Sequence, residues 1–221
     1  MLSHPVRFSI VVLANDHNPT ILNPDFLKAQ NIVPGDWELA GPPITTPPFA
    51  TVEYNSGVSI SVDSNKLQVT DNKTQIPNDS KVKNIVHQYV ETLSYVRYLS
   101  LGINFRYITE MDNADVFLKD HFLKEGPWSQ NSNDLKAIGF KFVYPLEGGR
   151  LVLSLDSASM KTSLNDQGEE NSVIIANANF HRNLDLKKPL AEEISSILGK
   201  ISEDWDRFNE IQSCMLKKND N

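Results

Sequence analysis

The sequence has 221 residues, of which 40% are hydrophobic and 22% are charged, so it can bury a sizeable core as an ordinary globular protein. Its formal net charge is −7, and both residues 1–101 and residues 102–221 are acidic overall, which argues against nucleic acid as a partner. A single cysteine excludes an intrachain disulfide, and no apolar run is long enough to cross a membrane. The first residues also lack the features of a signal peptide, so we expect a cytoplasmic protein.

The first half of the chain predicts a strand, a short helix, three more strands and a long helix. The strand covers 6–14, which is rich in branched side chains without a helical stripe, and the short helix covers 25–32. Five prolines within 34–48 predict an extended connector. Alternating apolar residues and turn residues then indicate strands at 49–54, 58–62 and 66–70. Ser80 is expected to cap a helix that continues to about Leu101 and stops at Gly102.

The second half of the chain repeats this order. We expect a strand at 103–108, a helix at 114–124, and strands at 138–144, 151–155 and 173–180. A polar loop at 161–171 precedes the last of these strands. The final helix is predicted to run from 190 to 216, because apolar residues recur there at helical spacing. At about 1.5 Å per residue it would span about 40 Å and cross a whole sheet.

Two sequence echoes link the halves. Phe26-Leu27-Lys28 is followed by Trp37 at the same spacing at which Phe117-Leu118-Lys119 is followed by Trp128. Asp63 and Asp156 each end an alternating strand pattern and precede a serine. A period of roughly ninety residues is typical of a duplicated half-domain and too long for a solenoid. We therefore predict an α+β fold of two tandem β-α-β-β-β-α repeats, residues 1–101 and 102–221, that form one compact unit.

This element order and duplication resemble the TATA-box-binding-protein-like architecture. The resemblance covers nearly the whole chain and implies a curved, mainly antiparallel sheet backed by two long helices. No functional residue follows from it, because this chain is acidic and its outward strand positions are Ser, Thr, Glu and Asp. The alternative is a helix-grip fold, in which the last helix lies in a single wrapped sheet above a ligand cavity.

Candidate binding residues come from the two echoes and from one strand. Trp37 and Trp128 could line a pocket, although we expect both to plug the gap between a short helix and the sheet. Asp63 and Asp156 could meet, share a proton or bind a metal, but Asp-Ser after a strand is ordinary turn chemistry, which we prefer. Arg106 is the fifth candidate.

Arg106 lies on a predicted strand and could hold an anion together with Arg97 and Tyr107. Pairing of this arginine with Glu53 or Asp63 on the polar face of the sheet is the simpler interpretation. None of the five histidines has a partner at metal-ligand spacing, and Gly148-Gly149 indicates a hairpin turn instead of a phosphate loop. We therefore predict no catalytic residue, no metal and no cofactor.

The sequence favours a non-enzymatic binding protein that recognises another protein. Its contact elements would be the polar sheet face and the loops at 34–48 and 161–171, because loops on a rigid scaffold commonly carry recognition. Self-association as a twofold dimer is compatible with this hypothesis. The alternative is a small-ligand-binding protein or hydrolase with a cavity between the C-terminal helix and the sheet.

Overall fold

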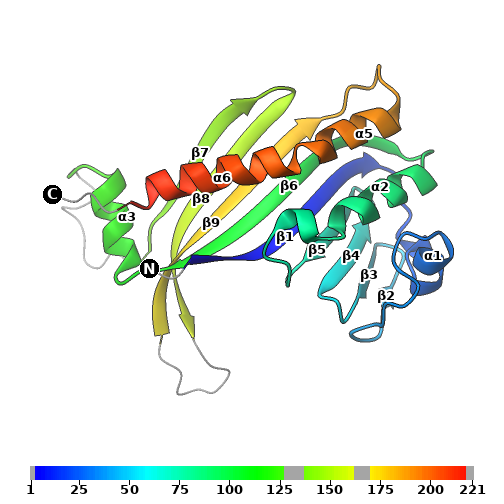
Figure 1. The fold of residues 1–221 in the computed structure, drawn as a ribbon, viewed down its shortest axis with the longest axis horizontal. Helices are drawn as coiled ribbons and strands as arrows, with labels where there is room; N and C mark the ends of the chain where they lie inside the picture. Colours follow the sequence, from blue (N-terminus) through cyan, green and yellow to red (C-terminus); the bar gives the residue numbers. More distant parts are fainter. Residues whose placement is uncertain (1–2, 127–136, 162–169, 218–221) are drawn as a thin grey trace.

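A computed structural model describes residues 3–126, 137–161 and 170–217. In this part of the chain nine strands form one antiparallel sheet, in the order β2-β3-β4-β5-β1-β6-β9-β8-β7 (Figure 1). The first five strands are β1 (Ser3–Asn15), β2 (Ile44–Thr45), β3 (Phe49–Glu53), β4 (Val58–Asp63) and β5 (Lys66–Asp71). The other four are β6 (Arg97–Glu110), β7 (Gly139–Leu146), β8 (Gly149–Lys161) and β9 (Glu170–Asn183).

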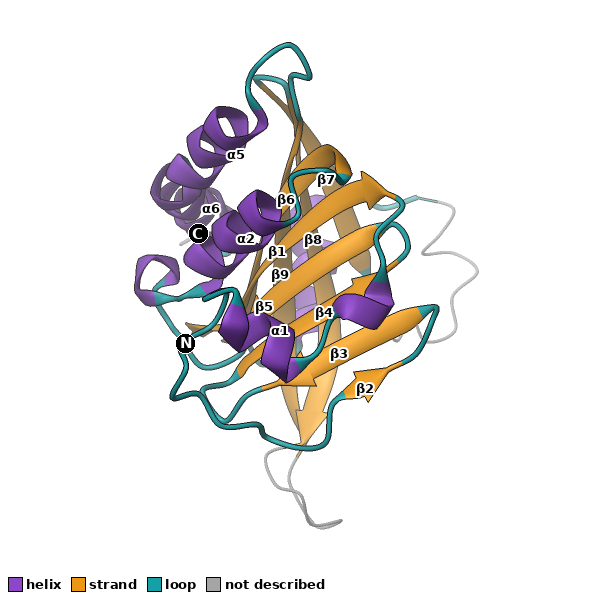
Figure 2. Cartoon of the chain, turned by 90° about the vertical axis from the view of Figure 1, so that its right-hand side faces the viewer, coloured by secondary structure: helices purple, strands orange, loops and turns teal. Residues whose placement is uncertain are grey.

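The helices pack on one face of this sheet, and the described residues place no helix on the other face (Figure 2). They are α1 (Pro24–Ala29), α2 (Val82–Thr92), α3 (Ala114–Phe122), α5 (Leu190–Gly199) and α6 (Ile201–Met215). Short 3-10 turns stand at Pro19–Ile21 and Pro77–Asp79. None of the described helices combines the length and the apolar surface that a bilayer crossing requires. Within residues 3–126, 137–161 and 170–217, helices therefore cover one face of the sheet only, and we call the other the helix-free face.

Alternation along the strands decides which side chains face the helices. In β4, Val58, Ile60 and Val62 are buried, while the serines between them are half-buried on the other face. In β8 the leucines at 151, 153 and 155 are buried in the same way. Because successive side chains of a strand point to opposite faces, the apolar set builds the core and the polar set forms the helix-free face.

Aromatic rings fill the contact between α6 and the sheet. Phe105 on β6 stacks on Phe208 of α6 with ring centroids 6.0 Å apart, and Tyr107 stacks on Trp205 at 5.7 Å. Beside them Arg182 of β9 donates two hydrogen bonds of 2.6 Å to the carboxylate of Asp204, and both side chains are buried. This packing holds the C-terminal helix directly against β6 and β9.

The predicted α+β class and the eight predicted strands are confirmed, most with shifts of a few residues at their ends. The strand predicted at 103–108 starts six residues earlier, at Arg97, and the strand predicted at 151–155 continues to Lys161. The final helix forms where expected but bends at Gly199 and Lys200, which divides it into α5 and α6. The sheet is open, and its edge strands are β2 and β7.

The long helix predicted from Ser80 to Leu101 is wrong. Helix α2 ends at Thr92, and the chain enters β6 at Arg97, so Gly102 lies inside a strand. The helical spacing of the apolar residues continued past this point, but β6 is hydrogen-bonded to β1 on one side and to β9 on the other. Those two long-range pairings outweighed the local preference.

Candidate functional site

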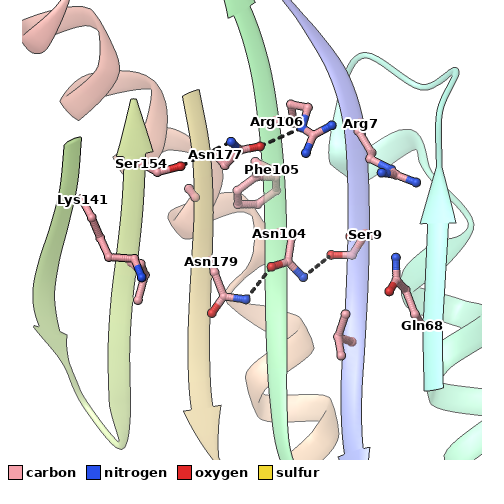
Figure 3. A pocket seen from close by; sticks show the side chains of 13 residues that line it. Arg7, Ser9, Gln68, Asn104, Phe105, Arg106, Lys141, Ser154, Asn177 and Asn179 are labelled. Carbon is pink, nitrogen blue, oxygen red and sulfur yellow. Dashed lines mark hydrogen bonds between the residues drawn. The ribbon is translucent and has the colours of Figure 1, made fainter. Parts of the chain in front are cut away.

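The helix-free face carries a shallow hollow of about 380 Å³ over β1, β5, β6, β9, β8 and β7 (Figure 3). We call its polar side chains the central patch: Arg7, Ser9, Gln68, Asn104, Arg106, Lys141, Ser154, Asn177 and Asn179. All of them come from outward positions of the strands, so one rigid sheet holds them. The described lining contains three cations and no carboxylate, in a chain whose net charge is −7.

Strand register lines up part of the central patch as a row that crosses the sheet. Successive Cα partners in this cationic row are Lys141 on β7, Ser154 on β8, Asn177 on β9, Arg106 on β6 and Arg7 on β1. Positive charges therefore stand at both ends of the row, with hydrogen-bonding side chains between them. Lys141, Arg106 and Arg7 are exposed to solvent.

A second row runs parallel to the first, two residues along each strand and therefore on the same face. Ser9, Asn104 and Asn179 are successive partners on β1, β6 and β9, and we call them the amide row. Asn179 donates to the Oδ1 of Asn104, and Asn104 donates to the carbonyls of Gly102 at 3.2 Å and Ser9 at 3.4 Å. These bonds fix the orientation of the amides and leave the Oδ1 of Asn179 as an available acceptor.

No known family model matches this chain, and no curated protein is similar to it.

Arg106 is the sequence-predicted residue that lies in the central patch. Its expected partner was wrong: Nε donates to Oδ1 of Asn177 at 2.7 Å, and no described ion pair joins it to Glu53 or Asp63. The alternative, an anion site that Arg106 would form with Arg97 and Tyr107, is also absent from the described residues. Arg97 pairs with Asp16 at 2.8 Å, and Tyr107 points to the helix side against Trp205.

The two aspartates lie far apart. Asp63 on β4 accepts a hydrogen bond from the backbone of Asn65 at 2.9 Å and lies 3.6 Å from Lys66, as the turn interpretation predicted. Asp156 lies inside β8, so the turn interpretation is wrong for this residue. It lies beside the central patch and accepts a hydrogen bond from Ser154 at 3.1 Å. Four strands separate β4 from β8, which at about 4.8 Å per strand is about 24 Å. They cannot share a proton or a metal ion, and the described residues contain no metal-binding cluster.

Trp37 does not contribute to the central patch. Trp37 is half-buried on the helix side and packs against Tyr54, with ring centroids 5.2 Å apart, which agrees with the predicted packing role. Trp128 lies outside the described residues, as do residues 162–169 of the second predicted contact loop. The connector at 34–48 is described and includes β2, at the opposite edge of the sheet from β7.

Most residues of the central patch were not predicted from the sequence as binding residues. Asn177 and Asn179 alternate with small or apolar residues, and this pattern predicts a half-exposed strand without singling out the amides. Arg7, Arg106 and Lys141 lie on three strands that only the register brings together. Period-two alternation identified the outward positions, but the neighbours across the sheet follow from tertiary structure.

A second polar cluster joins α2 to α5. His87 Nε2 lies 2.9 Å from the hydroxyl of Ser195, and His87 Nδ1 lies 3.4 Å from a carboxylate oxygen of Glu91. Lys83 and Asn84 line the same shallow cavity, which measures about 460 Å³. The order of a hydroxyl, an imidazole and a carboxylate matches a nucleophile, a base and a group that orients the base.

Proposed function

We propose that this protein is a non-enzymatic binding module that recognises an extended segment of another protein in the hollow of its helix-free sheet face. The observation that carries the proposal is the central patch itself. Nine polar side chains from six strands converge on one hollow, and the lining includes three exposed cations without a carboxylate partner in the described chain. Exposed polar groups held rigidly on a scaffold are suited to recognition.

The hydrogen bonds within the patch support binding more than catalysis. Asn104, Asn179 and Asn177 hold one another and Arg106 in fixed orientations, which lowers the entropy cost of binding. The patch contains no histidine, cysteine or carboxylate that could act as a base or a nucleophile. Amides and hydroxyls match the donors and acceptors of a peptide backbone.

A peptide-display selection tests this function. Random peptides selected on the wild-type protein should lose binding to Ser154→Trp, because the indole would fill the middle of the hollow. The matched control is Thr51→Trp, which places the same ring on the same sheet face at β3, outside the hollow. Selected peptides that bind Ser154→Trp as well as the wild type, or that shift amide resonances only on α2, α5 and α6, would overturn the proposal.

We also propose that residues 1–101 and 102–221 are copies of one ancestral unit, as in the TATA-box-binding-protein-like architecture. The strand order supports this: outward from the central pair β1 and β6, the sheet continues as β5-β4-β3 on one side and as β9-β8-β7 on the other. Leu27 of α1 and Leu118 of α3, from the two Phe-Leu-Lys segments, are both fully buried. A superposition of the two halves in an experimental structure, with these leucines at matched positions, tests the proposal. Unmatched leucines would refute it.

Hydrolysis is a second candidate function, favoured by the cluster of Ser195, His87 and Glu91. In this reaction the Ser195 oxygen would attack an ester carbonyl while His87 takes the hydroxyl proton and later returns it to the leaving alcohol. The Asn84 amide and the Lys83 ammonium line the cavity and could stabilise the oxyanion. We rank this function second because the cluster is open to water, where such interactions are weak.

A fluorophosphonate reagent tests the second candidate. Labelling that is lost in Ser195→Ala and retained in Ser196→Ala, the adjacent exposed serine, would establish Ser195 as a nucleophile. Absence of labelling, or equal labelling of both variants, would remove hydrolysis from consideration.

A further inference from the structure

We infer that the segment bound in the hollow is acidic, and that two of its carboxylates contact Lys141 and Arg106 of the cationic row. This inference rests on the proposed function and specifies the chemistry of the partner.

The central observation is that Arg7 and Arg106 are direct partners across the β1–β6 pair. Like charges at directly opposed positions destabilise a sheet, because their Cβ atoms are only about 5 Å apart. In the part of the chain that the structure describes, neither arginine forms an ion pair with a carboxylate. A bound anion would offset this repulsion.

Arg106 is oriented to receive such an anion. Its Nε donates to Asn177, whose own amide donates to Ser154 at 3.3 Å, and the Ser154 hydroxyl donates to Asp156. This chain of hydrogen bonds fixes the plane of the guanidinium and leaves the two terminal nitrogens of Arg106 for a ligand (Figure 3). A guanidinium held in this way binds a carboxylate through two parallel hydrogen bonds.

The charge spacing sets the spacing of the partner's carboxylates. Lys141 lies three strands from Arg106, which is about 14 Å at about 4.8 Å per strand. An extended peptide rises about 3.3 Å per residue, so about four residues cover this distance. Residues four apart in an extended chain point to the same side. Two acidic residues at positions i and i+4 can therefore contact Lys141 and Arg106 while the peptide crosses the strands.

The rest of the face favours a protein over a nucleic acid. Beyond the three cations of the row the chain is strongly acidic, and a polynucleotide would carry its phosphates into that negative field. The one aromatic ring in the lining, Phe105, is buried and cannot stack on a base. A short acidic peptide places its charges on the row alone, and its backbone groups can bond to Asn179 and Ser9 in the amide row.

Fluorescence anisotropy with short labelled peptides of glycine and serine tests this inference. The probe carries two glutamates four residues apart, one control carries glutamines at those positions, and another carries its two glutamates side by side. We expect the spaced-glutamate peptide to bind best, and to bind more weakly at about 200 mM than at about 50 mM salt. An oligodeoxynucleotide of similar length is measured in the same way, to test whether the row binds a nucleic acid instead.

Substitutions assign the binding to the cationic row. Arg106→Ala and Lys141→Ala should each weaken binding of the spaced-glutamate peptide by about tenfold or more. This is the loss of affinity expected when one charge-assisted hydrogen bond is removed. Asn177→Asp, which places a carboxylate beneath Arg106 with little change of shape, should abolish binding. Arg207→Ala on α6 removes one positive charge from the helix side of the molecule and should have no effect.

Three results would overturn the inference. They are equal binding of the glutamate and glutamine peptides, an equal loss in Arg207→Ala and Arg106→Ala, and tighter, Arg106-dependent binding of the oligonucleotide. Failure of the inference is distinguishable from failure of the proposed function. Display-selected peptides that are neutral but blocked by Ser154→Trp would retain the function and refute the acidic partner, whereas peptides insensitive to Ser154→Trp would refute the function.

Discussion

The buried pair of Arg182 and Asp204 gives the sharpest prediction about stability. Arg182 points from β9 to the helix side, and its two 2.6 Å hydrogen bonds to Asp204 attach the first turn of α6 to the sheet. Only 7% of the Arg182 side chain and 3% of the Asp204 side chain are exposed. Replacing Asp204 by alanine would leave a buried, unpaired guanidinium, because solvent cannot reach it.

Removal of one partner of such a buried pair costs about 3–5 kcal/mol. The unfolding entropy of 221 residues at about 2.1 cal/mol/K per residue is about 0.46 kcal/mol/K, so Asp204→Ala should lower Tm by about 6–11 °C. Replacing both partners by apolar residues, Arg182→Met with Asp204→Leu, should restore the wild-type Tm or exceed it, because no unpaired charge is then buried.

Thermal and urea unfolding followed by far-UV circular dichroism measure these changes. Lys200→Ala is the control, because its ion pair with Glu147 is 3.6 Å long and exposed, and its loss should cost less than about 1 kcal/mol. A loss below about 1 kcal/mol in Asp204→Ala, with an unchanged urea dependence, would refute this reasoning. A double variant as unstable as the single one would also refute it.

Three further predictions concern the pH dependence of stability at His17 and Asp71 and the replacement of a glycine at the turn between β7 and β8. Burial lowers the pKa of His17, whose ring nitrogens have no hydrogen-bond partner among the described residues, although the charge of Asp63 opposes the shift. His17 in the unfolded chain then binds a proton more tightly than in the folded chain, so the free energy of unfolding in urea should fall as the pH drops below about 6.5. This free energy should fall less steeply in His17→Phe. Burial raises the pKa of Asp71, but hydrogen bonds from Thr74, Lys73 and Ser80 outweigh it and hold the pKa below its ordinary value. The ionised Asp71 should stabilise the fold fully above about pH 4, and this stabilisation should be lost as the pH falls through the lowered pKa of the folded state. Asp71→Asn should remove this loss of stability in acid. A variant whose stability falls in acid as steeply as that of the wild type would contradict the prediction. A Cβ at Gly149 would lie 1.9 Å from the carbonyl oxygen of His181, whereas at Gly148, with φ +68°, it would meet nothing within 4 Å. Gly149→Ala should therefore cost about 3 kcal/mol or more by forcing β8 from β9, and Gly148→Ala only about 1–2 kcal/mol, as chemical unfolding can measure.

The sequence alone was sufficient for the class of the fold and for the faces of its strands. Alternation such as that of Val58, Ile60 and Val62 predicts one buried and one polar side for any strand that packs against a core. The apolar stripe of the last helix likewise predicted its position, because these patterns depend only on neighbours a few residues away.

Tertiary structure decided where β6 begins and which polar residues meet. Residues 97–101 have a local pattern compatible with a helix, and only pairing with β1 and β9 makes them a strand. The cationic row also depends on register: Lys141, Arg106 and Arg7 come from three distant parts of the chain, and a slip of one residue would turn a whole strand over. Long-range pairing fixes that register, and it leaves no mark in the spacing of residues along the sequence.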